Sequence, residues 1–130
     1  MYLTKSEMEV MQVFWKYTHP LTLNELIDAS TERSWKDRSG FSIIKNLISK
    51  GLIREEGFIH SGKTIARTFS ATCSYTDFVI EELKMYEGKI EFRQLFSHLL
   101  GDYNIEEDEI TALDKIIKEK KRELKGNDTD

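Results

Sequence analysis

The chain has 130 residues and a mass of 15.2 kDa, and its 19 basic residues against 23 acidic ones give a formal net charge of −4. This length suffices for one packed domain with a helical extension, but not for two large domains. No apolar run approaches the ~18 residues that cross a bilayer, and residues 1–15 lack the apolar stretch of a signal peptide. The single cysteine, Cys73, excludes an intramolecular disulfide. We therefore expect a soluble, cytoplasmic protein without membrane insertion.

The first two predicted helices each begin with a capping box. Thr4 is followed three residues later by Glu7, so that the hydroxyl and the carboxylate can each accept a backbone N–H at the start of a helix. Apolar residues then recur at helical spacing, which predicts a helix from about Lys5 to Tyr17. The same Thr-x-x-Glu pattern precedes a second, short helix over residues 23–29.

A third helix and a hairpin are expected next. Asp37 is expected to cap a helix that ends at about Lys50, with Gly51 after it at the positive φ that favours glycine. The predicted inner face of this helix consists of Phe41, Ile44, Leu47 and Ile48. Two extended runs, residues 52–55 and 64–70, flank a glycine-containing tip and predict a β-hairpin.

Helical spacing returns in the C-terminal half of the chain. Two amphipathic segments, residues 76–86 and 92–100, precede a last helix from about Glu106 to Leu124. The expected fold is therefore mainly α with a small hairpin (α+β): a winged helix-turn-helix followed by a helical region. We expect the winged-helix domain over residues 1–75, helices for dimerisation over 76–125 and a disordered tail over 126–130.

The net charge conceals an asymmetry that bears on DNA binding. Residues 1–75 hold ten basic and eight acidic residues, whereas the remainder holds nine basic and fifteen acidic ones. Charge asymmetry of this kind is a pointer to nucleic-acid interaction or to an acidic tail. In a winged helix, the helix after the short connector lies in the DNA major groove with its N-terminal residues against base edges.

The third helix carries polar side chains suited to that role. Arg38, Ser42 and Lys45 follow at i, i+4 and i+7, so they share one face. Arginine can bind guanine with two hydrogen bonds, and lysine neutralises phosphate. The predicted base or phosphate contacts are Lys36, Arg38, Ser39, Ser42, Lys45, Asn46, Lys50, Lys63 and Arg67. Gly40 interrupts this helix at a cost of about 1 kcal/mol relative to alanine, so we expect either a close backbone approach or a weak turn there.

These residues carry a resemblance to a known family. The run Leu3-Thr4-Lys5-Ser6-Glu7-Met8-Glu9-Val10-Met11 with Trp15, and Trp35 followed by Lys45-Asn46-Leu47-Ile48-Ser49-Lys50-Gly51-Leu52-Ile53, resemble the BlaI/MecI family of penicillinase and methicillin-resistance repressors. The resemblance implies a homodimeric transcriptional repressor that reads a palindromic double-stranded DNA operator. The family's third helix reads Thr-Val-x-Thr-Leu-Leu-x-Arg-Leu, whereas residues 39–47 here read Ser-Gly-Phe-Ser-Ile-Ile-Lys-Asn-Leu. Both hydroxyl positions are kept, but valine becomes Gly40 and arginine becomes Asn46, which implies a changed operator or weaker binding.

The resemblance also implies a route of induction. Family repressors are cleaved at an Asn-Phe bond after a membrane sensor-protease system acts, and the corresponding position here is His98-Leu99, where Asn-Phe is absent. The Cys-x-Cys pair of copper-responsive members is absent as well, which excludes copper sensing of that kind. The C-terminal helices are expected to form the dimer. Their predicted dimerisation residues are Phe92, Leu95, Phe96, Leu99, Ile110, Leu113 and Ile117.

Two other functions fit the same elements. One is a winged-helix module that binds a protein partner in place of DNA. The other is a regulator that senses a small ligand in a pocket lined by Tyr75, Phe78, Tyr86, Phe92 and Tyr103. The three histidines and Cys73 lack the spacing of metal ligands, and the chain has neither a phosphate-binding glycine loop nor a catalytic triad pattern. We expect no catalytic residues, no metal, no cofactor and no enzymatic activity.

Overall fold

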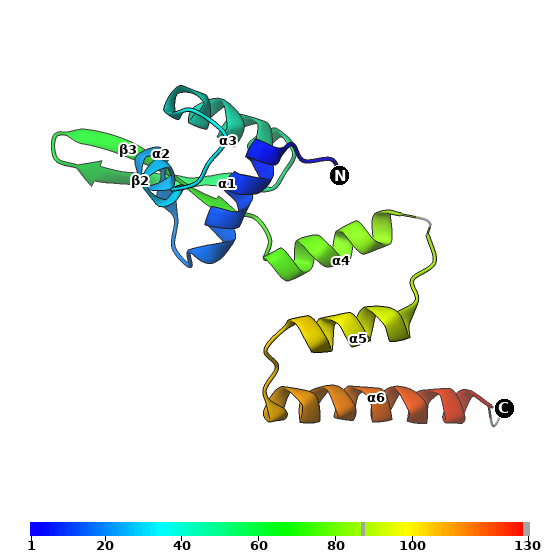
Figure 1. Ribbon diagram of the computed structural model, residues 1–130. Coiled ribbons are helices and arrows are strands. Elements are labelled where there is room, and N and C mark those ends of the chain that lie inside the picture. The colour runs from blue at the N-terminus through cyan, green and yellow to red at the C-terminus, as the bar shows by residue number, and fades with distance from the viewer. Residues whose placement is uncertain (87, 129–130) are drawn as a thin grey trace. The chain divides into compact units, whose positions relative to one another are not determined.

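The computed structural model describes residues 1–86 and 88–128, which form two compact units (Figure 1). The first unit is Met1–Glu87 and the second is Gly88–Asp130. The boundary between them therefore falls after the helix over Tyr75–Met85, which we had expected to belong to the C-terminal region. This helix joins the first unit because Phe78 is buried in its hydrophobic core, with its ring centroid 5.2 Å from that of Trp15.

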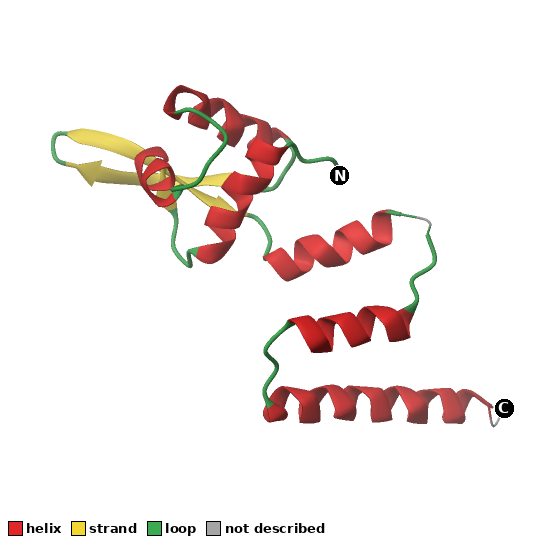
Figure 2. Cartoon of the chain, in the orientation of Figure 1, coloured by secondary structure: helices red, strands yellow, loops and turns green. Residues whose placement is uncertain are grey.

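The elements confirm a mainly helical α+β fold with a small sheet (Figure 2). The elements of the first unit are α1 (Lys5–Lys16), β1 (Leu21–Thr22), α2 (Leu23–Ala29), a 3₁₀ turn η1 (Asp37–Ser39), α3 (Gly40–Ser49), β2 (Ile53–Ser61), β3 (Thr64–Ala71) and α4 (Tyr75–Met85). Those of the second unit are α5 (Phe92–Asp102) and α6 (Glu107–Asp128). Three helices followed by the β2–β3 hairpin form the winged helix, and the hairpin is its wing.

Both predicted capping boxes are present. The hydroxyl of Thr4 accepts the backbone N–H of Glu7 at 3.1 Å, and the Glu7 carboxylate accepts the backbone N–H of Thr4 at 2.8 Å. Thr22 and Glu25 make the same pair of bonds at 3.1 and 3.0 Å. Each box satisfies backbone donors that a helix start leaves unpaired, which is why α1 and α2 begin where the sequence predicts.

The sheet has one strand more than expected. Its order is β1-β3-β2, all antiparallel, with Leu21 opposite Phe69 and Ile53 opposite Ala71. The pairing of β2 with β3 shifts between Glu55 and Gly57, which marks a β-bulge. The two-residue β1 anchors the base of the wing to the start of α2, so the wing is fixed to the helices.

The core of the first unit lies between α1, α2, α3 and the base of the sheet. Ile43, Ile44 and Leu47 of α3 are buried, while Ile48, which we predicted to face inward, is 37 % exposed. The buried face therefore consists of Ile43, Ile44 and Leu47, with Phe41 half-buried, and is rotated toward Ile43 relative to the prediction. Gly51 follows the helix at φ 80°, as predicted.

The second unit is an α5–α6 pair with few sheltered side chains. In its described part, four apolar residues are half-buried: Ile90, Leu95, Ile105 and Leu113. Every other apolar residue larger than alanine in this part is exposed. Helix α6 continues to Asp128, so the predicted disordered tail is wrong for residues 126–128, while residues 129–130 lie outside the described part. Within the described ranges, no helix has both the length and the apolarity that crossing a membrane requires.

Candidate nucleic-acid interface

The outer face of η1 and α3 displays polar side chains over its whole length. Five of the predicted contact residues are exposed here, and Ser39 is half-buried. The exposed ones are Lys36, Arg38, Ser42, Lys45 and Asn46. Arg38 lies in η1 and precedes α3, so its guanidinium is at the N-terminal end of the helix, where recognition helices meet base edges.

Close packing at Gly40 fixes the start of α3. A Cβ at this position would lie 2.9 Å from Leu23 Cδ1 and 3.2 Å from the Trp35 ring. A side chain at this position would therefore require Leu23 and the Trp35 ring to shift. Of the two explanations that we offered for this glycine, the structure supports the close approach.

Arg33 holds the connection between α2 and η1, a role that we did not predict. Its Nε donates to the Trp35 carbonyl at 2.9 Å, and one terminal nitrogen donates to the Ile27 carbonyl at 3.1 Å. The guanidinium also lies 4.7 Å from the Trp35 ring centroid and pairs with Asp37. The Asp37 carboxylate is thus bonded to Arg33, and neither η1 nor α3 has a side-chain cap, so the predicted capping role of Asp37 is wrong. The sequence held no signal for this role, because the i, i+4 rule applies within an α-helix and residues 30–36 form a non-helical connection.

Lys50 is engaged inside the first unit. Its ammonium donates to the Glu7 carboxylate at 2.7 Å and to the Tyr2 carbonyl at 2.9 Å. Glu7 is 3 % exposed, and burial alone raises its pKa, but the hydrogen bonds from Lys50 and Thr4 outweigh burial and leave the pKa of this carboxyl below its ordinary value. Lys50 therefore neutralises a buried carboxylate, and this pairing argues against the phosphate contact predicted for it.

The wing contributes two basic side chains. Lys63 is exposed at the tip, next to Gly62 with φ 63°. Arg67 on β3 lies 4.8 Å from the ring centroid of Phe41 on α3, and its Nε is 3.7 Å from a carboxylate oxygen of Glu55. The structure therefore brings Arg67 to α3, whereas Lys63 projects from the far end of the wing.

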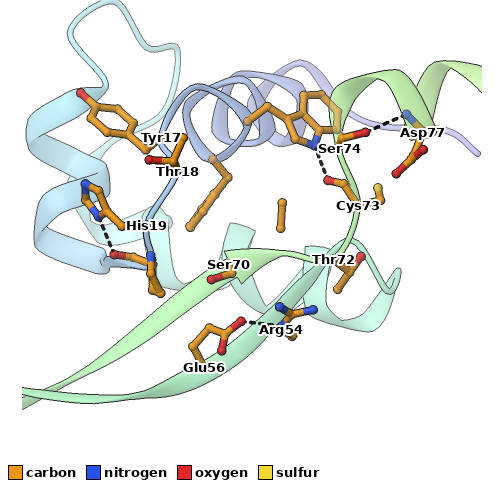
Figure 3. A pocket seen from close by; sticks show the side chains of 14 residues that line it. Tyr17, Thr18, His19, Arg54, Glu56, Ser70, Thr72, Cys73, Ser74 and Asp77 are labelled. Carbon is orange, nitrogen blue, oxygen red and sulfur yellow. Dashed lines mark hydrogen bonds and ion pairs between the residues drawn. The ribbon is translucent and has the colours of Figure 1, made fainter.

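A hollow of about 590 Å³ lies elsewhere on the first unit, between the end of α1, the base of the wing and the start of α4 (Figure 3). The Trp15 indole N–H donates to the Cys73 carbonyl at 3.0 Å, and Arg54 Nε lies 2.6 Å from a carboxylate oxygen of Glu56. Figure 3 marks the ion pair of Arg54 and Glu56 with a dashed line. Burial raises the pKa of the Cys73 thiol. None of the five aromatic residues that we predicted for a ligand pocket lines this hollow. Of those five, Phe78 is buried in the core, and Phe92 and Tyr103 belong to the second unit.

The remaining titratable residues do not gather into a further site. Across residues 1–86 and 88–128, no group of three or more His, Cys, Asp or Glu side chains has the arrangement needed to hold a metal ion. The His98–Leu99 bond lies within α5.

Comparison with known proteins assigns the chain to a family. The sequence model of the penicillinase repressor family matches residues 3–119, which is most of the chain. Among curated proteins, none shows significant sequence similarity.

Three solved structures show weak similarity to the chain. Bacillus subtilis PadR in complex with operator DNA has 18 % identity, covering 93 % of this chain and 74 % of that one at a TM-score of 0.47. The adhesin competence repressor AdcR of Streptococcus pyogenes has 16 % identity, with 94 % and 80 % covered at a TM-score of 0.45. S. aureus MepR in its DNA-binding conformation has 14 % identity, with 95 % and 80 % covered at a TM-score of 0.45. Since similarity at this level carries no functional argument, the assignment rests on the family match: the chain belongs to the penicillinase repressor family of DNA-binding, winged-helix transcriptional regulators.

Proposed function

We propose that this protein is a homodimeric repressor that reads a palindromic operator, with α3 in the major groove and the wing on the DNA backbone. The observation that carries this proposal is the exposed polar face of η1 and α3, which opposes a fully apolar inner face. A helix that is packed on one side and polar on the other can enter the major groove without disturbing its domain.

The side chains on this face match the chemistry of DNA. Arg38 suits guanine, whose O6 and N7 accept two hydrogen bonds, and Asn46 suits adenine. Ser42 can bond to either a base or a phosphate, while Lys45 and Lys63 suit phosphates. Lys50 is no longer part of this set, because it is bonded to Glu7.

The C-terminal helices support the homodimer. The predicted dimerisation residues on α5 and α6 remain largely exposed, with Phe92 at 69 %, Ile110 at 50 % and Ile117 at 46 %. Amphipathic helices that keep their apolar faces in water are stabilised by a partner surface. A two-fold dimer would place two copies of α3 on half-sites about one helical turn apart.

Induction by proteolysis at His98–Leu99 gains no support from the position of this bond. Proteases preferentially cut exposed loop tips and termini, whereas this bond lies inside α5. The proposed function therefore does not include cleavage of this chain through a membrane sensor-protease.

Selection of bound DNA from a random pool by the full chain tests the proposed function. We expect a palindrome of two half-sites, with an affinity that falls as salt rises because phosphate contacts release counterions. Failure to enrich any sequence, or binding that does not change with salt, would contradict the proposal. A protein partner for the winged helix would then be the better interpretation of the polar face.

A further inference from the structure

We infer that Arg67 reads a base beside α3, and that Phe41 is the positioning residue that holds its guanidinium there. This inference rests on the proposed function and extends it, because the proposed function places the wing on the DNA backbone and gives Arg67 no base to read. It makes one strand of the wing part of the sequence-reading surface.

Phe41 is an apolar exception near the polar N-terminal end of α3. It is half-buried, and two cations lie over its ring: the Arg67 guanidinium carbon at 4.8 Å from the ring centroid and the Lys45 ammonium at 5.8 Å. The guanidinium carbon of Arg67 is also 5.9 Å from the ring centroid of Phe69, which is 2 % exposed. Arg67 therefore rests on two aromatic rings, one from α3 and one from the core.

This stacking leaves the hydrogen-bonding edge of Arg67 available. A guanidinium on an aromatic face uses its π surface, while its N–H donors point outward in its own plane. Among the described residues, its only charged partner is Glu55, and the 3.7 Å between Arg67 Nε and the Glu55 oxygen is too long for a hydrogen bond. Both side chains are more than 40 % exposed, so water screens this pair.

The stack lies where a base contact is needed. Phe41 is the second residue of α3, and recognition helices contact bases through their N-terminal residues. A hollow of about 220 Å³ opens beside the stack, lined by Leu23, Asn24, Ala66 and Phe69 together with the stacked pair. The planar fork of Arg67 thus lies on the Phe41 ring beside open space, which is an arrangement that suits two hydrogen bonds to guanine O6 and N7.

Replacing Arg67 with lysine distinguishes a base-reading role from a phosphate-binding role. Lysine keeps the positive charge but lacks the planar fork and stacks poorly. A phosphate contact therefore survives Arg67→Lys, whereas two-bond reading of guanine does not. Phe41→Leu removes the ring and keeps an apolar side chain, and Phe41→Tyr keeps the ring.

The test is a binding panel with the full-length protein. Wild type first selects its operator, and each variant is then titrated against that operator and against versions with one base pair changed in both half-sites. We expect Arg67→Lys and Phe41→Leu to lose about tenfold to hundredfold discrimination at the same base pair, with an unchanged salt slope. Phe41→Tyr should keep the discrimination. Lys63→Gln is the matched control, because it should weaken binding to all sequences equally and reduce the salt slope by about two, one phosphate contact being lost in each protomer of the dimer.

The outcomes separate the inference from the proposed function. If wild type is selective and Arg67→Lys keeps discrimination at every position, Arg67 is a phosphate contact and the inference alone is overturned. If Phe41→Leu loses discrimination at a different position from Arg67→Lys, Phe41 does not position Arg67. If wild type selects no sequence at all, the proposed function fails and the inference fails with it. Thermal unfolding of each variant verifies that it is folded, and Arg67→Lys tests the inference even if Phe41→Leu unfolds.

Discussion

The two compact units of this chain differ in how far their apolar side chains are buried. The first unit buries thirteen hydrophobic residues, and Val10, Met11, Leu26, Ile44 and Leu47 are fully inaccessible. In the second unit, no residue in the range 88–127 is buried, although α5 and α6 are both amphipathic. Since burial contributes about 25 cal/mol per Å² of apolar surface, the first unit can fold on its own, whereas the second gains little without a partner surface. This contrast agrees with the proposed function, in which the first unit binds DNA and the second forms the dimer.

Removing the second unit should separate the two roles most strongly. A chain that ends at residue 87 keeps the complete core, so we expect it to unfold cooperatively. Its affinity for the palindromic operator should fall by about 10²–10⁴-fold, because the second half-site no longer adds to the first. Fluorescence anisotropy measures the affinity, and the full chain on a single half-site is the control. Unchanged affinity of the shortened chain would contradict the division.

The same substitution in each unit should act on a different property. Ile44→Ala removes a side chain that is 0 % exposed, so we expect a loss of about 2–5 kcal/mol in the free energy of unfolding. Ile117→Ala, at 46 % exposure, should leave thermal unfolding of the first unit unchanged and weaken self-association. Urea unfolding and sedimentation measure the two effects. Equal effects of both substitutions on unfolding would show that the units do not differ as described.

A substitution on the DNA-binding face should change operator binding without changing dimerisation. Arg38→Ala removes an exposed guanidinium at the entry to α3, so the operator complex should lose about 1–3 kcal/mol, with relaxed specificity at one base pair. Sedimentation should show an unchanged oligomeric state. An equal loss of affinity for all DNA sequences would instead make Arg38 a phosphate contact.

A larger side chain at Gly40, where Leu23 and Trp35 pack closely, should have a smaller effect on the free energy of unfolding. Gly40→Val restores the residue that the family pattern has at this position, but its Cβ would meet Leu23 and the Trp35 ring. Overpacking should cost about 1–3 kcal/mol of unfolding free energy, and the gain in helix propensity offsets only part of it. Thermal unfolding checks this prediction, and a more stable variant would show that the contact relaxes freely.

The smallest effect concerns the buried carboxylate. Because the pKa of Glu7 is lower in the folded than in the unfolded chain, its contribution is present above about pH 4.5 and is lost as the pH falls through the folded value. Lys50→Met removes the hydrogen bond that lowers this pKa, so we expect a loss of about 1–2 kcal/mol at pH 7. Urea unfolding should show the difference from wild type shrinking as the pH falls below about 4.5. A difference that does not change with pH would exclude Glu7 as its source.

The features predicted correctly from sequence are those set by local chemistry. The two capping boxes, the helices that they start and the positive φ of Gly51 depend on residues within one turn of each other. Strand β1 was missed because a two-residue strand has no pattern of its own and exists through its pairing with Phe69 and Thr68.

The candidate interface was predictable in its general composition and less so in its individual contacts. The polar residues at 42, 45 and 46 are exposed, as helical spacing predicts, whereas Lys36 and Arg38 are exposed at the 3₁₀ turn that precedes the helix. The partners of charged residues were not predictable, because they come from distant parts of the chain. Lys50 bonds to Glu7 across 43 positions, and Arg67 meets Phe41 only because the wing folds back beside α3.

The central claim is that the first unit binds the operator and the second unit holds two chains together as a dimer. Sedimentation equilibrium tests this claim most directly. The full chain is measured alone at micromolar concentration and then with its selected operator. Our account predicts a dimer in the absence of DNA and two chains on each palindromic operator. A monomer in solution that binds the operator as a single chain would contradict it.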